Sequence, residues 1–347
     1  MVPNNDKNIN AEMTVIQALN ELGLSAALKA ANINKRCGIE IKKVFMALFS
    51  LCFYGLSWNR FISSDRHADF AKDARYRFLK NEHFNWRTFI RCIALKCIEL
   101  CNKANDKDKT KVLIFDDTPY ARKGSEKTDM ISRIYDHVSH TSYNGYLLLT
   151  CGWSDGNSFV PLDFAFTASK YLIQDNSDGI DKRTIGYKRR MEALTIKNDL
   201  VYEMVNRIHN LGVEFDYVLM DSWYSFPAAF DEIKTNSVDL IGMVKRSSKI
   251  AFIFNGKKIS IPGLYKIAMK QKYRRSMADA AFTGILSTIT VQTESGTRVR
   301  LVFAVNRNCP DKYVVISSSD TSLSADEIIE IYSRRWQTEC FYKIAKG

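Results

Sequence analysis

The hydrophobic and polar positions divide the chain into two stretches with different periodicity. From Ala11 to about Asn105, apolar residues recur at three- and four-residue spacing, which is typical of amphipathic helices. The charged segment Lys103 to Thr110 interrupts this pattern, and the apolar runs that follow have the length of strands. We therefore predict an α-helical N-terminal domain over residues 1–105 and an α/β domain over residues 106–347.

The second stretch predicts elements in the order β-β-β-α-β-α-β. The core elements are strands at Lys111–Asp117, Tyr146–Trp153 and Phe159–Phe166, a helix around Met191–Leu211, a strand ending at Asp221, a helix near Ala228–Lys234, and a strand ending near Lys245. Further strand patterns over about 246–322 predict a β-rich insertion. A final helix follows from about Ala325, with Ser324 as its cap.

Composition and charge narrow the class of protein. The 347 residues are 46% hydrophobic and 25% charged, as in an ordinary globular protein and unlike disordered, collagenous or membrane-embedded chains. The longest apolar run, Val44 to Leu56, falls short of the ~20 residues that span a bilayer, so it predicts a buried helix. Residues 1–12 are polar and lack the apolar part of a signal peptide, which predicts a cytoplasmic protein with no membrane partner. The net charge of +12 favours a polyanionic partner such as DNA.

Basic residues also gather in the helical stretch. The segment from Arg60 to Arg91 carries several Lys and Arg side chains among aromatic ones. A solvated helix surface and a DNA-contacting surface are equally consistent with this pattern.

Two carboxylates stand at the carboxyl ends of predicted buried strands. Asp116 follows the run VLIF, and Asp221 follows YVLM. Sheets of α/β proteins place ligands and catalytic groups at such ends. A single Asp at a strand end is usually only a turn or cap residue, so neither position decides the function alone.

The last predicted helix adds a third carboxylate. Tyr332, Arg335, Glu339 and Lys346 fall within roughly 60° of one another at about 100° per residue, and Trp336 lies beside them. The alternative is that apolar residues of this helix face the core and the polar stripe is only solvated. Two Asp and one Glu are, however, the oxygen ligands that hold Mg²⁺ or Mn²⁺. Two such ions about 3.5–4 Å apart can promote displacement at phosphorus, and the basic side chains suit phosphates.

The spacing Tyr-x2-Arg-x3-Glu-x6-Lys, from Tyr332 to Lys346, resembles the signature of the insertion-sequence-four family of bacterial DDE transposases. The block Asp221-Ser-Trp-Tyr resembles the second motif of that family, although Trp223 and Tyr224 depart from its small-residue preference and spacing. The run IFDDT supplies the first Asp of the family. Of its two Asp residues we prefer Asp116, because Asp117 would point to the other face of the strand.

The resemblance implies a ribonuclease-H-like catalytic domain with a β-rich insertion. It implies a transposase that performs metal-dependent DNA cleavage and strand transfer, with Asp116, Asp221 and Glu339 as catalytic residues and ligands of Mg²⁺ or Mn²⁺, as two ions. The partners implied are transposon ends and target DNA, together with a second copy of the chain in a homodimer. The residues implied to contact DNA are Tyr332, Arg335, Trp336, Lys346, Lys245 and Arg246.

Three other interpretations are weighed against this one. The chain stops at Gly347, one residue past Lys346, where family members carry more chain, so a truncated and inactive DNA-binding remnant is the alternative. A nuclease of the same fold is a further possibility, which the Tyr-Arg-Glu-Lys pattern disfavours. A phosphatase of the haloacid-dehalogenase type is excluded because Thr118 stands where its second Asp is required.

Overall fold

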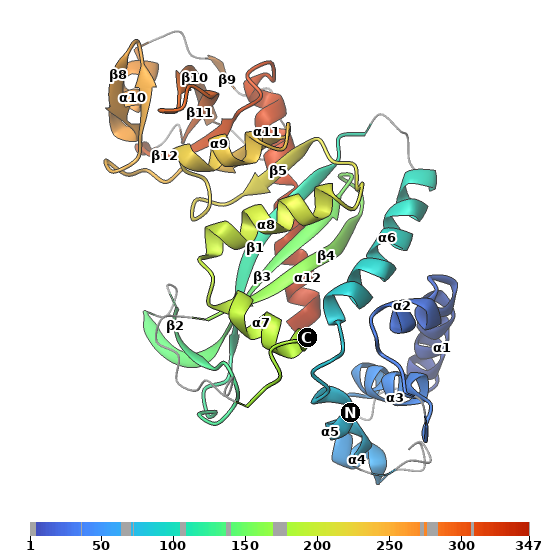
Figure 1. Ribbon diagram of the computed structural model, residues 1–347. Helices are drawn as coiled ribbons and strands as arrows, with labels where there is room; N and C mark the ends of the chain where they lie inside the picture. Colours follow the sequence, from blue (N-terminus) through green and yellow to red (C-terminus); the bar gives the residue numbers. More distant parts are fainter. Residues whose placement is uncertain are drawn as a thin grey trace.

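The computed structural model describes residues 5–35, 37–63, 71, 73–104, 109–136, 140–168, 179–270, 274–275, 284–306 and 309–346. Its elements form a mixed α/β structure built around one large sheet (Figure 1). Within these ranges, none of the helices combines the length and the apolar character needed to cross a bilayer.

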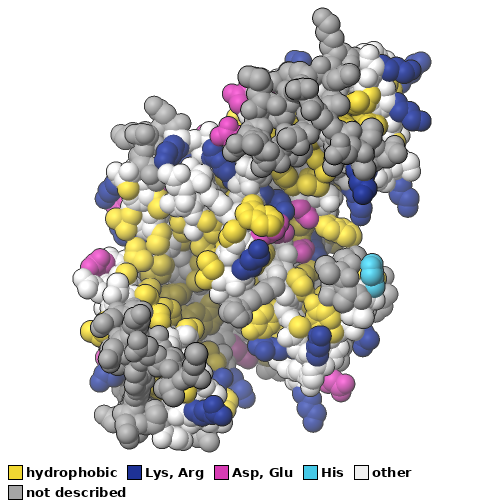
Figure 2. Space-filling view, turned by 180° about the vertical axis from the view of Figure 1, so that it is seen from behind, with side chains coloured by type: hydrophobic (Ala, Val, Ile, Leu, Met, Phe, Trp, Pro, Cys, Tyr) yellow, Lys and Arg dark blue, Asp and Glu magenta, His cyan; other side chains and the backbone are white. Residues whose placement is uncertain are grey.

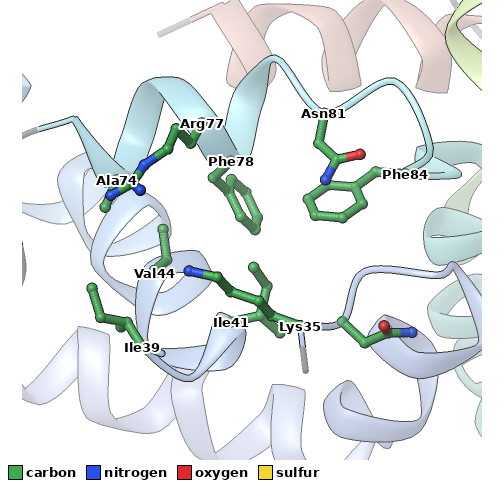
Figure 3. A pocket seen from close by; sticks show the side chains of 10 residues that line it. Lys35, Ile39, Ile41, Val44, Ala74, Arg77, Phe78, Asn81 and Phe84 are labelled. Atoms are coloured by element: carbon green, nitrogen blue, oxygen red, sulfur yellow. The ribbon is translucent and has the colours of Figure 1, made fainter. Parts of the chain in front are cut away.

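The first third of the chain is helical, as its periodicity predicts. The helices are α1 (Asn5–Glu21), α2 (Leu24–Ala30), α3 (Ile41–Tyr54), α4 (Trp58–Ile62), α5 (Ala74–Leu79) and α6 (Trp86–Ala104). Apolar side chains of α2, α3 and α6 pack into one cluster with Phe78 and Phe84. Beside this cluster lies a cavity of about 170 Å³, lined by apolar side chains and by the polar side chains of Lys35, Arg77 and Asn81 (Figure 3).

The remainder of the chain builds a twelve-stranded sheet. The strands are β1 (Val112–Ala121), β2 (Ser132–Asp136), β3 (Thr141–Ser154), β4 (Phe159–Thr167), β5 (Tyr217–Met220), β6 (Asp239–Met243), β7 (Ala251–Phe254), β8 (Lys257–Ser260), β9 (Arg274–Arg275), β10 (Gly284–Gln292), β11 (Arg298–Asn306) and β12 (Cys309–Ser318). Their order is β2-β3-β1-β5-β6-β12-β11-β10-β7-β8, with β4 paired to β3 and β9 to β10.

The centre of the sheet combines antiparallel and parallel pairs. β1 pairs antiparallel with β3 and parallel with β5, and β5 pairs parallel with β6. The strands after β6 join the same sheet, because β12 pairs antiparallel with β6. The predicted β-rich insertion therefore extends the central sheet.

Helices cover both faces of this sheet (Figure 1). On one face, α8 (Lys197–His209), α9 (Pro227–Lys234) and α10 (Ile261–Ala268) pack in a core that includes Leu113 and Phe115 of β1. On the other face, α11 (Ala325–Ser333) packs over Val112 and Ile114. Alternate residues of β1 thus serve different cores, as the two-residue period of a strand requires.

The structure adds one element to those predicted and divides two of the predicted helices. A short strand, β2, lies between the first two predicted strands. The predicted helix around Met191–Leu211 is two helices, α7 (Ile185–Ala193) and α8, separated by Leu194 to Ile196. The last helix is also divided, into α11 and α12 (Trp336–Lys346), with a turn at Arg334 and Arg335. The predicted cap is confirmed, because the Ser324 side chain accepts from the backbone N–H of Glu327 in a capping box.

Candidate active site

Asp116 lies within β1, and Asp221 directly follows β5, the parallel neighbour of β1. Ile114 of β1 is paired with Leu219 of β5, so both carboxylates occur two residues beyond a paired position. Ile114 and Leu219 share the core under α11, and the alternation of strand side chains therefore places Asp116 and Asp221 toward this same face. The sheet register brings together two residues that are far apart in the sequence.

Asp117 has a different environment from Asp116. Its Oδ2 accepts a hydrogen bond of 2.5 Å from the Tyr224 hydroxyl and forms an ion pair with Lys197 Nζ at 3.0 Å. Tyr224 and Lys197 belong to the side of the sheet where α8 packs. Asp117 therefore ties α8 and the turn after β5 to β1, while Asp116 faces the helices on the opposite side.

The turn between α11 and α12 brings a cation to these carboxylates. Arg335 Nη1 donates to Asp116 Oδ2 at 3.2 Å, and its Nη2 donates to Glu339 Oε1 at 2.6 Å. The guanidinium of Arg335 thus bridges Asp116, which lies within β1 and not at the strand end that its sequence predicts, and the helical Glu339, two of the three predicted ligands. Figure 2, which views the molecule from behind, shows acidic and basic side chains side by side near the middle of that face.

Helix α12 is fixed to the sheet by polar contacts on either side of Glu339. The Tyr342 hydroxyl donates to the carbonyl oxygen of Asp116 at 2.9 Å and also contacts the Thr150 hydroxyl. Near the start of the helix, Gln337 Nε2 donates to the carbonyl oxygen of Gly156 at 2.9 Å. These bonds position the backbone that carries Glu339 relative to the strand that carries Asp116.

Burial and like charge perturb the two Asp residues. Burial raises the pKa of Asp116 to about 7; the nearby Arg335 lowers it, and Asp221 and Asp117 raise it further. The pKa of Asp221 is also raised, chiefly by burial, while the backbone N–H of Trp223 acts in the opposite direction. Groups whose charge is disfavoured in this way are common at functional sites, because a bound cation can compensate them.

The predicted DNA-contacting residues differ in how exposed they are and in what they contact. Tyr332 is buried, with the guanidinium of Arg335 beside its hydroxyl. Trp336 is 56% exposed, and Lys343 Nζ lies 5.1 Å from its ring centroid. Lys245 lies over Trp223, and Arg246 over Tyr313, so this adjacent pair diverges. The side chain of Lys346 lies outside the described residues.

The profile of the DDE superfamily endonucleases matches residues 61–258, more than half of the chain. The chain belongs to this DDE superfamily. A second profile, the transposase DDE domain, matches residues 197–347. Together the two DDE matches include Asp116, Asp221 and Glu339. The curated proteins contain no match to the chain.

Among solved structures, the DDE chain is similar to one in a cryo-EM structure of a piggyBac transposase synaptic complex with hairpin DNA. The sequences are 11% identical, and the TM-score is 0.43. The similarity covers 91% of this chain and 62% of that chain. The DDE chain thus spans less than two thirds of the transposase chain that it matches.

Members of the DDE superfamily act with divalent metal ions, and the donor chemistry of this site fits such an ion. Asp116, Asp221 and Glu339 offer the carboxylate oxygens that Mg²⁺ and Mn²⁺ prefer. The pKa of Asp116 is raised chiefly by burial, and a cation bound at its carboxylate would stabilise the charged form. In the part of the chain that the structure describes, no three Asp, Glu, His or Cys side chains are close enough to hold an ion together. Arg335 bridges Asp116 and Glu339 instead.

A second charged cluster of this DDE protein was not predicted. Asp163 of β4 is buried, and Arg87, Arg91 and Arg207 surround its carboxylate at 2.7, 2.6 and 3.3 Å. Arg87 and Arg207 also pair with Glu192 of α7. Arg87 and Arg91 therefore contact protein carboxylates, contrary to a DNA-contacting or solvated role for this end of the basic segment. Arg66 and Lys72 of that segment lie outside the described residues.

Proposed function

We propose that the chain is a DNA transposase of the insertion-sequence-four type, which cleaves DNA at the ends of a mobile element and joins them to target DNA. The proposal rests mainly on one arrangement: Asp116 of β1 and Asp221 after β5 each lie two residues beyond the last pair of the parallel β1–β5 ladder, and Arg335 connects Asp116 with Glu339 of α12. The two DDE profile matches support the same conclusion.

The ribonuclease-H-like fold is part of this proposal. Its support is the strand order β4-β3-β1-β5-β6, in which β4, β3 and β1 are antiparallel neighbours and β1, β5 and β6 are parallel. Because β1, β5 and β6 are parallel, their chains run toward the same edge of the sheet. α/β sheets commonly bind their ligands at such an edge.

We assign Asp116, Asp221 and Glu339 as the ligands of Mg²⁺ or Mn²⁺, as two ions. Ions bound there would stabilise the attacking and leaving oxygens of a displacement at phosphorus. Arg335 and Tyr332 hold the DNA strand that is cleaved near these carboxylates. The other predicted contacts bind the DNA next to it; they are Trp336, Lys346, Lys245 and Arg246. Two copies of the chain, as a homodimer, bind the two ends of the mobile element.

Nicking of a duplex that carries the inverted repeats flanking the gene tests this function. We expect strand cleavage with Mg²⁺ or Mn²⁺ by the parent protein and by Glu330→Gln, a matched exposed change in α11. Glu339→Gln and Asp116→Asn are expected to lower the rate by at least 10³-fold, with DNA affinity retained within a few-fold. Specific DNA binding by the parent without metal-dependent cleavage would instead identify a DNA-binding remnant. Cleavage by Glu339→Gln at the parental rate would refute the assignment of Glu339.

A further inference from the structure

Asp117 is held on the face of the sheet opposite Asp116 by two residues from a neighbouring part of the fold. Its Oδ2 accepts a hydrogen bond of 2.5 Å from the Tyr224 hydroxyl and lies 3.0 Å from Lys197 Nζ. Tyr224 is buried, and the Asp117 and Lys197 side chains are partly exposed. The carboxylate of Asp117 is therefore engaged away from those of Asp116 and Asp221, and the charge of Lys197 balances its own.

Tyr224 belongs to the tight turn that begins at Asp221. The backbone N–H groups of Tyr224 and Ser225 donate to the carbonyl oxygen of Asp221 at 3.2 and 3.1 Å. The Tyr224 ring packs in the core on the α8 side, and the buried Ser225 hydroxyl donates to the carbonyl oxygen of Met220 at 3.3 Å. A short series of contacts thus leads from the backbone of Asp221 through Tyr224 to Asp117.

These contacts connect the two candidate metal ligands beyond the end of the β1–β5 ladder. The last residues paired in that ladder are Ile114 and Leu219, so backbone pairing ends two residues before each ligand. Asp117 directly follows Asp116, and its backbone N–H donates to Asp116 Oδ1 at 3.0 Å. The hydroxyl bond to Asp117 therefore links the turn that carries Asp221 to β1 at a point that lies beyond the paired residues.

We propose that Asp117 and Tyr224 are positioning residues, which set the separation of Asp116 and Asp221 and thereby the affinity of the site for a divalent ion. The inference rests on the proposed function, because it takes these two carboxylates as ligands of the ion. Neither positioning residue has to touch the ion or the DNA, since the contact between them lies on the other face of the sheet. Contacts that orient metal ligands commonly change metal affinity by about 10- to 100-fold.

A second way for Asp117 to act on a bound ion is through its charge. Asp117 raises the pKa of both Asp116 and Asp221, so its charge is felt at both carboxylates and would also attract a cation. Tyr224→Phe removes the hydroxyl and leaves every charge in place. Asp117→Asn/Lys197→Gln and Asp117→Ala/Lys197→Gln each remove one charge of either sign, and only the Asn variant keeps a side-chain oxygen that can accept from Tyr224.

Binding of Mn²⁺ to the full chain without DNA, followed by the electron paramagnetic resonance signal of free Mn²⁺, tests the position of the carboxylates. We expect Tyr224→Phe and Asp117→Ala/Lys197→Gln to weaken Mn²⁺ binding by about 10- to 100-fold, and Asp117→Asn/Lys197→Gln to stay within about fivefold of the parent. Thermal melting in EDTA checks that each variant is folded.

Tyr217→Phe is the matched control, because it removes the same kind of bond at the other end of β5. The Tyr217 hydroxyl donates to Asp320 Oδ2 at 2.9 Å. Its loss should lower the melting temperature and leave the Mn²⁺ affinity within about twofold of the parent, since Tyr217 lies away from the carboxylates. A loss of Mn²⁺ affinity in Tyr224→Phe alone is therefore separated from a general loss of stability.

The proposal is overturned if Tyr224→Phe binds Mn²⁺ within about twofold of the parent, or if Tyr217→Phe weakens binding as much as Tyr224→Phe. Equal affinities of the Asn and Ala variants at Asp117 would also overturn it, because the acceptor oxygen would then be without effect.

The nicking assay is scored separately. Mn²⁺ binding that Tyr224→Phe weakens, without nicking by the parent, would contradict the proposed transposase activity and leave the positioning role intact. Nicking by the parent together with an unchanged Mn²⁺ affinity in Tyr224→Phe would contradict only the positioning role. A parent protein that binds no Mn²⁺ would contradict both.

Discussion

Asp163→Asn should destabilise the protein strongly, because three arginines depend on this buried carboxylate. The carboxylate side chain has 0% exposed surface, and the Arg87, Arg91 and Arg207 side chains are only 13%, 17% and 26% exposed. The variant retains the shape of the residue and removes its charge. Arg87 and Arg207 keep Glu192, but Arg91 is left with no carboxylate partner among the described residues. One uncompensated guanidinium in such a place costs about 3–5 kcal/mol of unfolding free energy.

Urea denaturation followed by circular dichroism measures this loss. Asp181→Asn is a matched control, because Asp181 also pairs with an arginine but the Arg183 side chain is 90% exposed; we expect a change within about 0.5 kcal/mol. The double variant Asp163→Asn/Arg91→Met should recover part of the loss, since it also removes the orphaned charge. A loss below about 1 kcal/mol for Asp163→Asn, or strict additivity in the double variant, would refute this reasoning.

The same carboxylate predicts a pH dependence. Burial alone would raise the pKa of Asp163, but the surrounding Arg87, Arg91 and Arg207 lower it below its ordinary value. A lowered folded-state pKa contributes stability above the unfolded-state pKa of about 3.9, and this contribution is lost as the pH falls through the folded-state value. The difference in unfolding free energy between the parent and Asp163→Asn should therefore be constant above about pH 5 and shrink on acidification.

Two further variants test the candidate active site. Arg335→Gln leaves the partly buried carboxylates of Asp116 and Glu339 without their cation, so we expect the unfolding free energy to fall by roughly 1–3 kcal/mol. Adding Mg²⁺ should then raise the melting temperature of the variant more than that of the parent, and equal rises would contradict this prediction. Arg183→Gln, at an exposed ion pair, is the control. Tyr342→Phe removes the hydroxyl that bonds the Asp116 carbonyl, so we expect a loss of about 1–2 kcal/mol by urea denaturation and slower nicking. The exposed change Tyr135→Phe should have little effect on stability, and a Tyr342→Phe protein with parental stability would show that α12 is held by other contacts.

Local patterns were sufficient to predict the strands that carry the candidate site. The apolar runs before Asp116 and Asp221 are β1 and β5, because buried strands next to covering helices need apolar residues on both faces. The same periodicity distinguished Asp116 from Asp117, which the structure places with Lys197 on the α8 side. The strand β2 was missed, because its sequence SRIYD is short and half polar and pairs only with β3.

Contacts between distant segments could not be predicted in this way. Asp163 stands within an apolar run, and its partners Arg87 and Arg91 lie more than 70 residues earlier in the chain. Nothing in the local pattern of either segment indicates the other. The role of Tyr342 was also missed. An aromatic residue on an amphipathic helix predicts core packing, and nothing near it in the sequence indicates that its hydroxyl bonds the backbone of β1.

The break between α11 and α12 explains how Glu339 comes to face the site. In one continuous helix, at about 100° per residue, Glu339 would lie almost directly below Tyr332, on the face that α11 buries. The turn at Arg334 and Arg335 rotates the buried face of α12 to Thr338 and Tyr342. Glu339 is thereby left at the border of the buried face, with 32% of its side chain exposed and its carboxylate on Arg335. The sequence has no Gly or Pro at this turn, so its helical pattern predicts one continuous helix where the structure has α11 and α12.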